Sequence, residues 1–217
     1  MTPSMRTFFS ALLLTAALAP AFAQVVDDAA VRTIRASKAA VVSLAIAPKG
    51  DRLLIGLDKG AELYDLETGK KLFAFPYNED GGTAVYYVAF NDNGEYAVLI
   101  GHSGKRVVWD LKTGKPEPSL QQHRWVPDPR AVKAMGLDMS NSTFDRFYQQ
   151  SELKLGAYTV RSGKDGVVDF VDAEGKTAQQ LKPDANKDQH HRAPLMLWQE
   201  WLLSGTDDGR VLFYRVR

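Results

Sequence analysis

Short apolar runs separated by turn residues recur along the chain in groups of three. Val, Ile, Leu, Tyr and Phe dominate the runs, and Gly, Asn or Asp stands between them, which is the composition of β-strands joined by tight turns. A weaker run follows Thr-Gly-Lys after each of the first two groups. Each group therefore predicts a four-stranded antiparallel meander. The runs of the first two groups are 41–46, 53–56 and 62–66, then 86–90, 97–101 and 107–111.

The first run of each group alternates in side-chain size with a period of two. Val42, Leu44 and Ile46 are expected on one face of the sheet, with Ala45 and Ala89 on the other. A helix does not keep this period. The second group repeats the large positions with Tyr86, Val88 and Phe90.

A further copy of the pattern ends the chain. Its runs at 195–197, 201–203 and 210–214 are apolar, and the residues at 204–209 form the clearest turn sequence of the set. This copy again predicts strands joined by tight turns.

An interrupted copy lies between the second group and the last. Met135, Leu137 and Met139 match a first strand, residues 155–160 a second and 166–172 a third, with an insertion between the first two. The period of about 45 residues predicts an all-β repeat fold. We place the repeats at roughly 41–76, 85–121, 132–182 and 193–217.

The repeats resemble those of the WD-repeat β-propeller family, over nearly the whole length after residue 23. The match rests on Tyr64-Asp65, on Trp109-Asp110 and on the turn from Ser204 to Gly209, together with the repeat length. The resemblance implies a β-propeller of about four WD-like, four-stranded antiparallel blades. It also implies that the protein serves as a platform for protein interactions.

Two features depart from the family's pattern. Ala36-Ser37 stands before the first blade, where the family has Gly-His, and Gly101-His102 falls in a different turn. The hydrogen-bonded set of His, Ser or Thr, Asp and Trp that stiffens typical blades is therefore incomplete. Aspartates still occupy equivalent turn positions, and we expect them to have a structural role. They are Asp58, Asp165 and Asp208.

Closure of the ring depends on both ends of the sequence. The last repeat supplies only three strands before Arg217, and the resemblance implies that a strand within residues 31–36 completes it and closes the ring. Four blades are at the lower limit for a propeller. One chain could form a four-bladed ring, or two chains could share an eight-bladed ring as a homodimer. We favour the single-chain ring because it needs no partner.

Residues 1–23 have the pattern of a secretory signal peptide. Arg6 precedes an apolar run from Phe8 to Ala19, which is followed by a small-x-small cleavage sequence. The run of about 12 residues falls short of the roughly 20 that span a bilayer as a helix. We expect cleavage near Ala23–Gln24, a periplasmic or secreted location, and a soluble propeller domain over 24–217 with no membrane span.

Charge and cysteine content narrow the partners and the chemistry. The sequence has 27 Lys and Arg against 26 Asp and Glu, so nucleic acid is not an expected partner. It has no cysteine, so an exported domain must be stabilised by a packed core and not by disulfides. Its 45% hydrophobic and 10% aromatic residues are typical of a globular fold.

The sequence offers no convergent catalytic set, and we expect no enzyme activity, no metal site and no cofactor. His190-His191 stands near Asp188 in a stretch of loop composition, where adjacent side chains diverge. His102 is expected in an exposed turn. No Gly-x-Ser-x-Gly, phosphate-binding loop or metal-ligand spacing occurs.

Segments that interrupt the repeat are the candidate binding regions, because loops on a rigid framework commonly carry binding. Residues 121–130 link the second and third repeats, and residues 141–154 form the insertion. Both combine arginine with aromatic side chains, which are enriched at interaction hot spots. The alternative is that the aromatic side chains cover the flank of the propeller. The candidate partner surface consists of Arg124, Trp125, Phe144, Arg146, Phe147 and Tyr148.

The leading hypothesis is an exported, non-catalytic scaffold that binds a protein partner. One alternative is a ligand-binding or hydrolytic propeller with a site at one mouth of the ring, built from Asp128, Asp138, Asp145 and His123. Another is a structural assembly subunit whose edge strands complete a neighbour's sheet. The resemblance favours the scaffold, although a fold alone does not determine function.

Overall fold

The structure, a computed structural model, describes residues 24–78, 82–101, 105–121, 150–163, 166–182 and 193–217. These residues form four four-stranded antiparallel sheets and one short helix, α1 (Pro118–Gln121). The architecture is the all-β set of four blades that the repeats predict. The predicted signal peptide lies outside the described residues. Among the described helices none is long and apolar enough to cross a membrane.

Three of the four sheets are simple meanders. Blade 1 consists of β2 (Val41–Ile46), β3 (Arg52–Leu57), β4 (Gly60–Asp65) and β5 (Lys71–Phe75). Blade 2 consists of β6 (Val85–Phe90), β7 (Tyr96–Gly101), β8 (Arg106–Asp110) and β9 (Lys115–Pro116). Blade 3 consists of β10 (Glu152–Leu155), β11 (Tyr158–Ser162), β12 (Val168–Val171) and β13 (Thr177–Leu181).

Blade 4 takes its strands from both ends of the described chain. It consists of β14 (Leu195–Trp198), β15 (Trp201–Gly205), β16 (Arg210–Arg215) and, on the outside, β1 (Arg32–Arg35). β1 is antiparallel to β16, and Ile34 lies opposite Val211, both of them buried. The expected N-terminal strand therefore completes the last blade, within a single chain.

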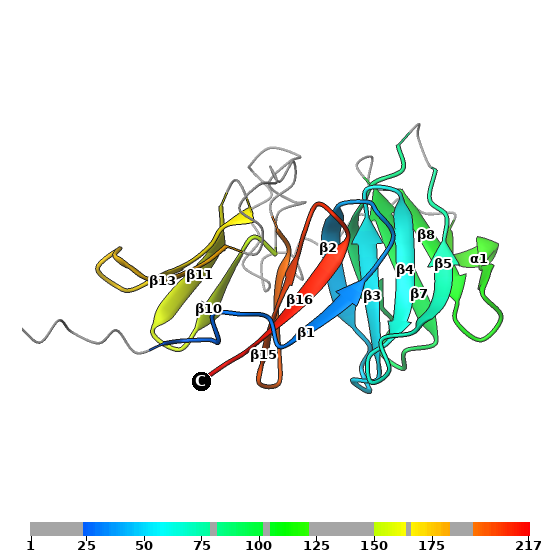
Figure 1. The fold of residues 1–217 in the computed structure, drawn as a ribbon. Coiled ribbons are helices and arrows are strands. Elements are labelled where there is room, and N and C mark those ends of the chain that lie inside the picture. The colour runs from blue at the N-terminus through cyan, green and yellow to red at the C-terminus, as the bar shows by residue number, and fades with distance from the viewer. Residues whose placement is uncertain (1–23, 79–81, 102–104, 122–149, 164–165, 183–192) are drawn as a thin grey trace, which may run out of the picture.

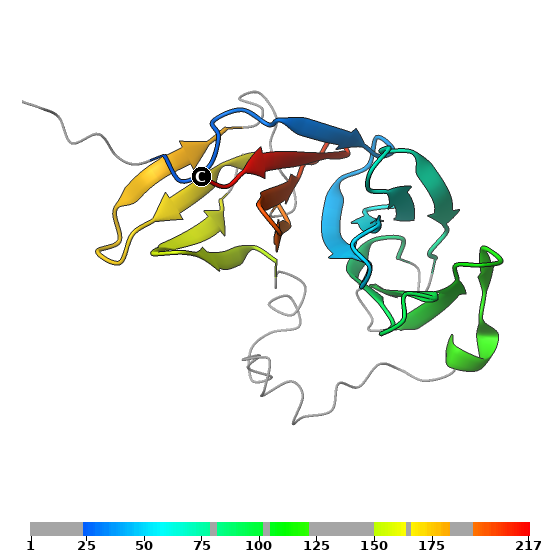
Figure 2. The same cartoon turned by 90° about the horizontal axis from the view of Figure 1, so that it is seen from below.

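The blades lie along an arc in the order 3, 4, 1, 2 (Figures 1 and 2). β10 packs against β14, β14 against β2, and β2 against β6, so the first strand of each meander lies on the inner side of the arc. Three apolar clusters fill the seams between blades 3 and 4, blades 4 and 1, and blades 1 and 2. Burial in these seams is the main force that holds the blades together.

A β-bulge interrupts the alternation expected in the first strands. Val41 lies opposite Leu57 and Ser43 opposite Gly56, which leaves Val42 without a partner. Because the bulge adds one residue, Val41 joins Leu44 in the seam between blades 4 and 1, instead of lying on the opposite face. The same shift occurs at Tyr86 in blade 2. The expectation of strict alternation from Val42 and Tyr86 was wrong at these positions.

The strands of blade 3 also differ from the expected ones. The segment 155–160, predicted as a single strand, contains the turn of the β10–β11 hairpin, with Leu155 opposite Tyr158. Gly156 has φ of +57° in that turn, a conformation that glycine adopts without strain. Met135, Leu137 and Met139, the predicted first strand, lie outside the described residues, and β10 holds that position in the sheet.

The far face of blade 3 is polar. A row across its four strands carries Glu152, Arg161, Asp169 and Gln180 in register. Arg161 Nε donates to Glu152 Oε2 at 2.8 Å, and Gln180 Nε2 donates to Asp169 Oδ1 at 2.7 Å. Arg161 and Glu152 are both more than half exposed, at 56% and 53%. Such a face is typical of a terminal repeat that ends a stack of sheets.

Glycine permits the closest approach between blades 1 and 2. A Cβ added at Gly56 would lie 2.0 Å from Ser43 Oγ and 2.5 Å from the carbonyl oxygen of Val85 in β6. Ser43 Oγ in turn donates to that carbonyl at 2.7 Å, which ties the two blades together. No side chain larger than hydrogen fits there without moving the blades.

Replacing Gly56 with alanine is therefore expected to lower the free energy of unfolding by about 2–4 kcal/mol. Urea denaturation of residues 24–217 measures the loss. Gly163→Ala is the matched control, because the nearest atom to its added Cβ is 3.5 Å away. Equal losses in the two variants would contradict the close approach of blades 1 and 2.

Candidate functional site

The six residues of the predicted partner surface lie outside the described residues, as do Asp165 and all four histidines. The same holds for Asp128, Asp138 and Asp145, the carboxylates of the alternative site at one mouth of the ring. Those assignments stay predictions. In the described part of the chain, no three His, Cys, Asp or Glu side chains gather as a metal site would require.

Asp208 lies in the turn between β15 and β16. Its Oδ1 accepts hydrogen bonds from Thr206 Oγ1 at 2.6 Å and from Arg210 Nε at 2.8 Å. Arg210 N donates to Thr206 Oγ1 at 2.9 Å, so the turn is braced from both sides. These contacts favour a structural role for Asp208 over a catalytic one.

Asp58 lies in the equivalent turn of blade 1, between β3 and β4. Its backbone N donates to the carbonyl oxygen of Ala40, and its own carbonyl oxygen accepts from Thr83 Oγ1 at 2.9 Å. Ala40 lies in the connection that leads into β2, and Thr83 lies in the connection from β5 to β6. The turn therefore joins neighbouring segments of the propeller.

The inner side of the arc is occupied by Gln150, which immediately precedes blade 3. Its side-chain amide makes two hydrogen bonds to the backbone of Leu44 in β2, each of 2.8 Å. The backbone carbonyl oxygen of Gln150 accepts from Leu195 N, at the start of β14, at 2.6 Å. The Gln150 side chain thus pairs with the inner edge of blade 1 much as another strand would.

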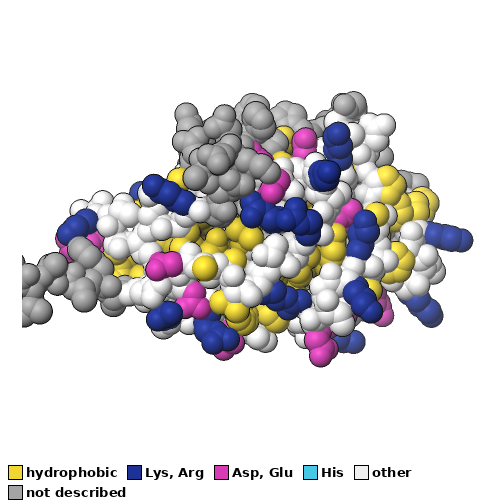
Figure 3. All heavy atoms as spheres, in the orientation of Figure 1, with side chains coloured by type: hydrophobic (Ala, Val, Ile, Leu, Met, Phe, Trp, Pro, Cys, Tyr) yellow, Lys and Arg dark blue, Asp and Glu magenta, His cyan; other side chains and the backbone are white. Residues whose placement is uncertain are grey.

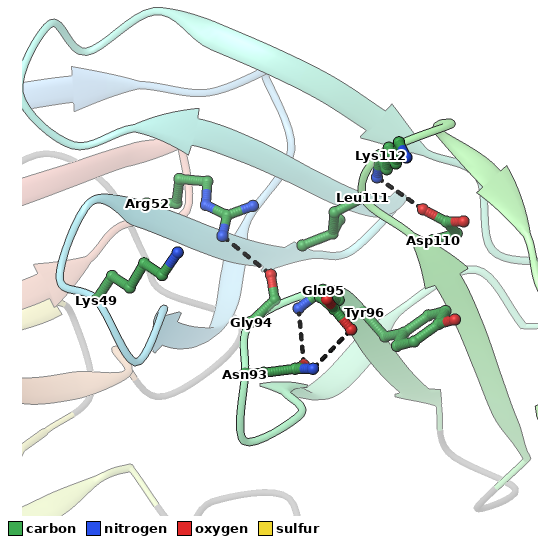
Figure 4. Close-up of a pocket in the computed structure, with 9 residues that line it drawn as sticks. All are labelled: Lys49, Arg52, Asn93, Gly94, Glu95, Tyr96, Asp110, Leu111 and Lys112. Carbon is green, nitrogen blue, oxygen red and sulfur yellow. Dashed lines mark hydrogen bonds between the residues drawn. The ribbon is translucent and has the colours of Figure 1, made fainter.

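A pocket of about 410 Å³ opens between blades 1 and 2, on the side of the β2–β3 and β6–β7 turns (Figure 4). Three cationic side chains line it: Lys49 and Arg52 from blade 1 and Lys112 from blade 2. Glu95 and Asp110 also contribute to its wall. We call this cavity the basic pocket.

Arg52 is the most firmly held cation of the basic pocket. Its Nη2 donates to the carbonyl oxygen of Gly94 at 2.9 Å, and its Nε lies 3.4 Å from Asp51 Oδ1. The guanidinium carbon lies 5.9 Å from the ring centre of Phe90, within the range of a cation–π contact. A guanidinium has five N–H donors, so several remain for a ligand.

The carboxylates in the same wall have partners within their own turns. Asp110 Oδ1 accepts from the backbone N of Lys112 at 2.7 Å and of Thr113 at 3.1 Å. Glu95 Oε2 accepts from Asn93 Nδ2 at 2.6 Å. No hydrogen bond or ion pair to another described residue is found for the ammonium groups of Lys49 and Lys112. The pocket therefore presents more unused donors than acceptors.

A second pocket of about 440 Å³ lies between blades 4 and 1. Trp198 and Trp201, which face each other across the turn of the β14–β15 hairpin, line it together with buried Leu66 and Phe213. We call this cavity the tryptophan pocket. Lys49 lines both pockets, so they are neighbours.

Charged groups at the rim of the tryptophan pocket are held by local contacts. Arg32 lies with its guanidinium carbon 5.3 Å from the ring centre of Phe213 and donates to the carbonyl oxygen of Glu67 at 3.2 Å. Hydrogen bonds from the hydroxyl and backbone N of Thr68 hold the pKa of Asp65 below its ordinary value. The Asp65 carboxylate is therefore ionised at neutral pH.

The two pockets occupy equivalent positions in the repeat. Gly50, Asp65 and Leu66 of the tryptophan pocket correspond to Gly94, Asp110 and Leu111 of the basic pocket. The other wall comes from the preceding blade, which is blade 1 for the basic pocket and blade 4 for the tryptophan pocket. The chemistry differs there, because Trp201 of blade 4 takes the position that Arg52 has in blade 1. Repeat geometry thus creates two similar cavities, and the sequence makes one basic and the other aromatic.

A buried carboxylate network joins blade 1 to the connection between β1 and β2. Glu62 is 6% exposed and accepts hydrogen bonds from Ser37 N at 3.1 Å, Tyr64 Oη at 2.7 Å and Lys71 Nζ at 3.2 Å. Burial of Tyr64 raises the pKa of its phenol above the ordinary value, and the hydrogen bond to Glu62 raises it further. These partners satisfy the buried charge, so the network belongs to the fold and not to a reaction site.

Basic and acidic side chains are interspersed on the face of the molecule seen in Figure 3, with hydrophobic side chains between them. No extended basic stripe of the kind that nucleic-acid-binding proteins carry is seen among the described residues of that face. No signal in the sequence indicated the pockets, because the residues that line them come from different repeats.

Comparison with known proteins yields structural likeness at low sequence identity. No family model matches the chain, and no curated protein matches it in sequence. The WD40 repeats of RRP9 are similar, with 13% identity and a TM-score of 0.38 over 82% of this chain and 49% of that one. The structure of U3-55K is 14% identical, with a TM-score of 0.37 over 80% of this chain and 47% of that one. The computationally designed Ika8 protein is 16% identical, with a TM-score of 0.30 over 81% of this chain and 46% of that one.

The chain therefore spans about half the length of the solved structures to which it is similar, at 49%, 47% and 46%. Its architecture rests on its own strand order and pairing, which are those of four propeller blades.

Proposed function

We propose that this protein is an exported, non-catalytic scaffold that binds a protein partner. The observation that carries the proposal is the pair of neighbouring pockets between rigid blades, one basic and one aromatic. Arginine and tryptophan in partly enclosed sites are the residue types that dominate the energetics of protein interfaces. The signal-peptide pattern predicted in residues 1–23 is the reason to propose export to the periplasm or the exterior.

The alternative, a ligand-binding or hydrolytic propeller with a site at one mouth of the ring, depends on residues that lie outside the described part of the chain. We favour the scaffold because the described residues offer two pockets between blades and no group of three metal-binding side chains. The third hypothesis, an assembly subunit, relies on edge strands that complete a neighbour's sheet. The edge of β16 is not available for this, because β1 of the same chain pairs with it.

Capture of partners from the extracytoplasmic fraction of the native host tests this function. We expect the wild-type chain, recovered without residues 1–23, to retain specific proteins identified by mass spectrometry. A variant with Arg124→Ala, Trp125→Ala and Phe147→Ala is expected to lose about tenfold or more of that capture while keeping its urea midpoint, because hot-spot residues carry most of the binding energy.

Lys59→Ala is the control, since Lys59 is exposed and belongs neither to the predicted partner surface nor to either pocket. Undiminished capture by the triple variant would remove Arg124, Trp125 and Phe147 from the partner surface. Absence of any specific partner for the wild-type chain would contradict the scaffold itself.

A further inference from the structure

The basic pocket and the tryptophan pocket are adjacent and differ in polarity. They share Lys49, and each has a volume, about 410 and 440 Å³, that accommodates an amino-acid side chain. A single ligand that reaches both must therefore carry two different groups a short distance apart. Successive side chains of a polypeptide satisfy this requirement.

The basic pocket selects an anionic group. Arg52 is oriented by Gly94 and Phe90 before any ligand arrives, so little conformational entropy is lost when it binds. Lys49 and Lys112 add two ammonium groups from opposite walls. The planar fork of an arginine matches a carboxylate, which can accept two parallel hydrogen bonds.

The tryptophan pocket selects an apolar or aromatic group. Trp198 and Trp201 are partly exposed, whereas Phe213 behind them is only 1% exposed. One side of Trp201 is occupied by Arg215, whose guanidinium carbon lies 5.3 Å from the indole centre. Trp198, on the other strand of the hairpin, is also partly exposed and lies beside the turn at Gly50, where an added Cβ would be 3.6 Å from its indole nitrogen.

We infer that these two pockets bind an extended segment of a partner protein, with an Asp or Glu side chain in the basic pocket and an aromatic side chain in the tryptophan pocket. The inference rests on the proposed scaffold function and specifies the chemistry of its partner. Charge in one pocket sets the register of the segment, and aromatic burial in the other supplies much of the affinity.

Synthetic peptides test the inference before the natural partner is identified. Each peptide carries one Trp and a Glu pair, in both orders, separated by glycine spacers of increasing length. Binding is followed by NMR of ¹⁵N-labelled residues 24–217, using the indole N–H of Trp198 and the amide of Gly94 as reporters. At about 1 mM peptide, binding with a Kd in the millimolar range or tighter is detected.

We expect at least one spacer to shift both reporters together. Lys112→Glu, at an exposed position, and the peptide with Gln in place of Glu should each weaken binding by about tenfold or more, because each removes the charge pairing. Trp198→Ala should weaken it to a similar extent, whereas Lys59→Gln should leave it unchanged.

Two results would overturn the inference: no shift of the reporters with any spacer, or binding that is insensitive to both Lys112→Glu and the Gln peptide. If host proteins are still captured in that case, the scaffold function stands and only this assignment of its surface fails. If neither peptide nor host protein binds, the proposed function fails as well.

Discussion

A chain that begins at Ser37 is expected to lose cooperative folding. Deleting residues 24–36 removes β1 and with it Ile34, which is 2% exposed, together with Val25 and Val26, which are 9% and 0% exposed. Burial of each such side chain contributes about 1.5–3 kcal/mol. The combined loss is comparable to the whole stability of a typical domain, about 5–15 kcal/mol.

The same segment also connects blades 3 and 4. The side-chain Oε1 of Gln179 in β13 accepts hydrogen bonds from the backbone N of Val25 and Val26, at 2.9 and 3.1 Å. Its Nε2 donates to the carbonyl oxygen of Val26 at 2.8 Å. Val26 pairs with Val216 beyond the end of β16. The deletion therefore opens the edge of blade 4 and releases the contact to blade 3 in one step.

Urea denaturation followed by circular dichroism measures this effect against the chain that begins at Gln24. A chain that begins at Ala30 keeps β1 but loses the Gln179 contacts, and it should be intermediate in stability. Adding a synthetic peptide of residues 24–36 to the chain that begins at Ser37 should restore the transition. An unchanged urea midpoint for the chain that begins at Ser37 would contradict the role of β1.

Gly209→Ala is expected to have the second-largest effect, a loss of about 4 kcal/mol or more in the free energy of unfolding. Gly209 has φ of +80°, and an added Cβ would lie 1.8 Å from the carbonyl oxygen of Ser37. The Gly209 carbonyl also accepts from Ala36 N at 2.7 Å. The turn and the β1–β2 connection would have to separate, and the seam between blades 4 and 1 would open with them.

Gly175→Ala separates the cost of a positive φ from the cost of the close approach to Ser37. Gly175 has nearly the same φ, +83°, but an added Cβ meets nothing within 4 Å. It should therefore lose only the roughly 1 kcal/mol that a positive φ costs a residue with a side chain. Similar losses in the two variants, measured by thermal or urea unfolding, would show that Gly209 does not contact Ser37.

The sequence predicted the repeat, the strands of blades 1, 2 and 4, and the completion of blade 4 by β1. The strands could be predicted because alternating apolar residues and turn glycines act locally, within about ten positions. The completion of blade 4 joins opposite ends of the chain, and it was predicted from the resemblance to WD-repeat propellers and not from a local pattern. The bulges at Val42 and Tyr86 could not be predicted, since a bulge depends on how the neighbouring blade packs. The Gly156 turn within blade 3 was overlooked although it contained a turn residue.

The pockets were beyond sequence reasoning for a different reason. Arg52 and Gly94 are 42 positions apart and meet only because consecutive blades stack. Glu62 likewise looked like an ordinary strand residue, and its burial depends on Ser37 and Lys71 reaching it from other segments. Long-range placement follows from the repeat once its strand order is known, and not from any local pattern.

The most direct test of the architecture is the disulfide formed by a Thr33→Cys, Leu212→Cys variant of residues 24–217. These residues are opposite each other in β1 and β16, and the bond from Ala36 N to Gly209 O makes them a non-hydrogen-bonded pair. Cα atoms in such pairs are about 4.5 Å apart, within the range of a disulfide. The natural sequence has no cysteine, so every disulfide observed is the engineered one.

Mass spectrometry and non-reducing electrophoresis after mild oxidation report the outcome. The structure predicts complete intrachain oxidation at the mass of one chain, with free thiols in both single-cysteine controls. A disulfide between two chains would contradict it and would favour the shared ring, in which the N-terminal strand of one chain completes the last blade of another.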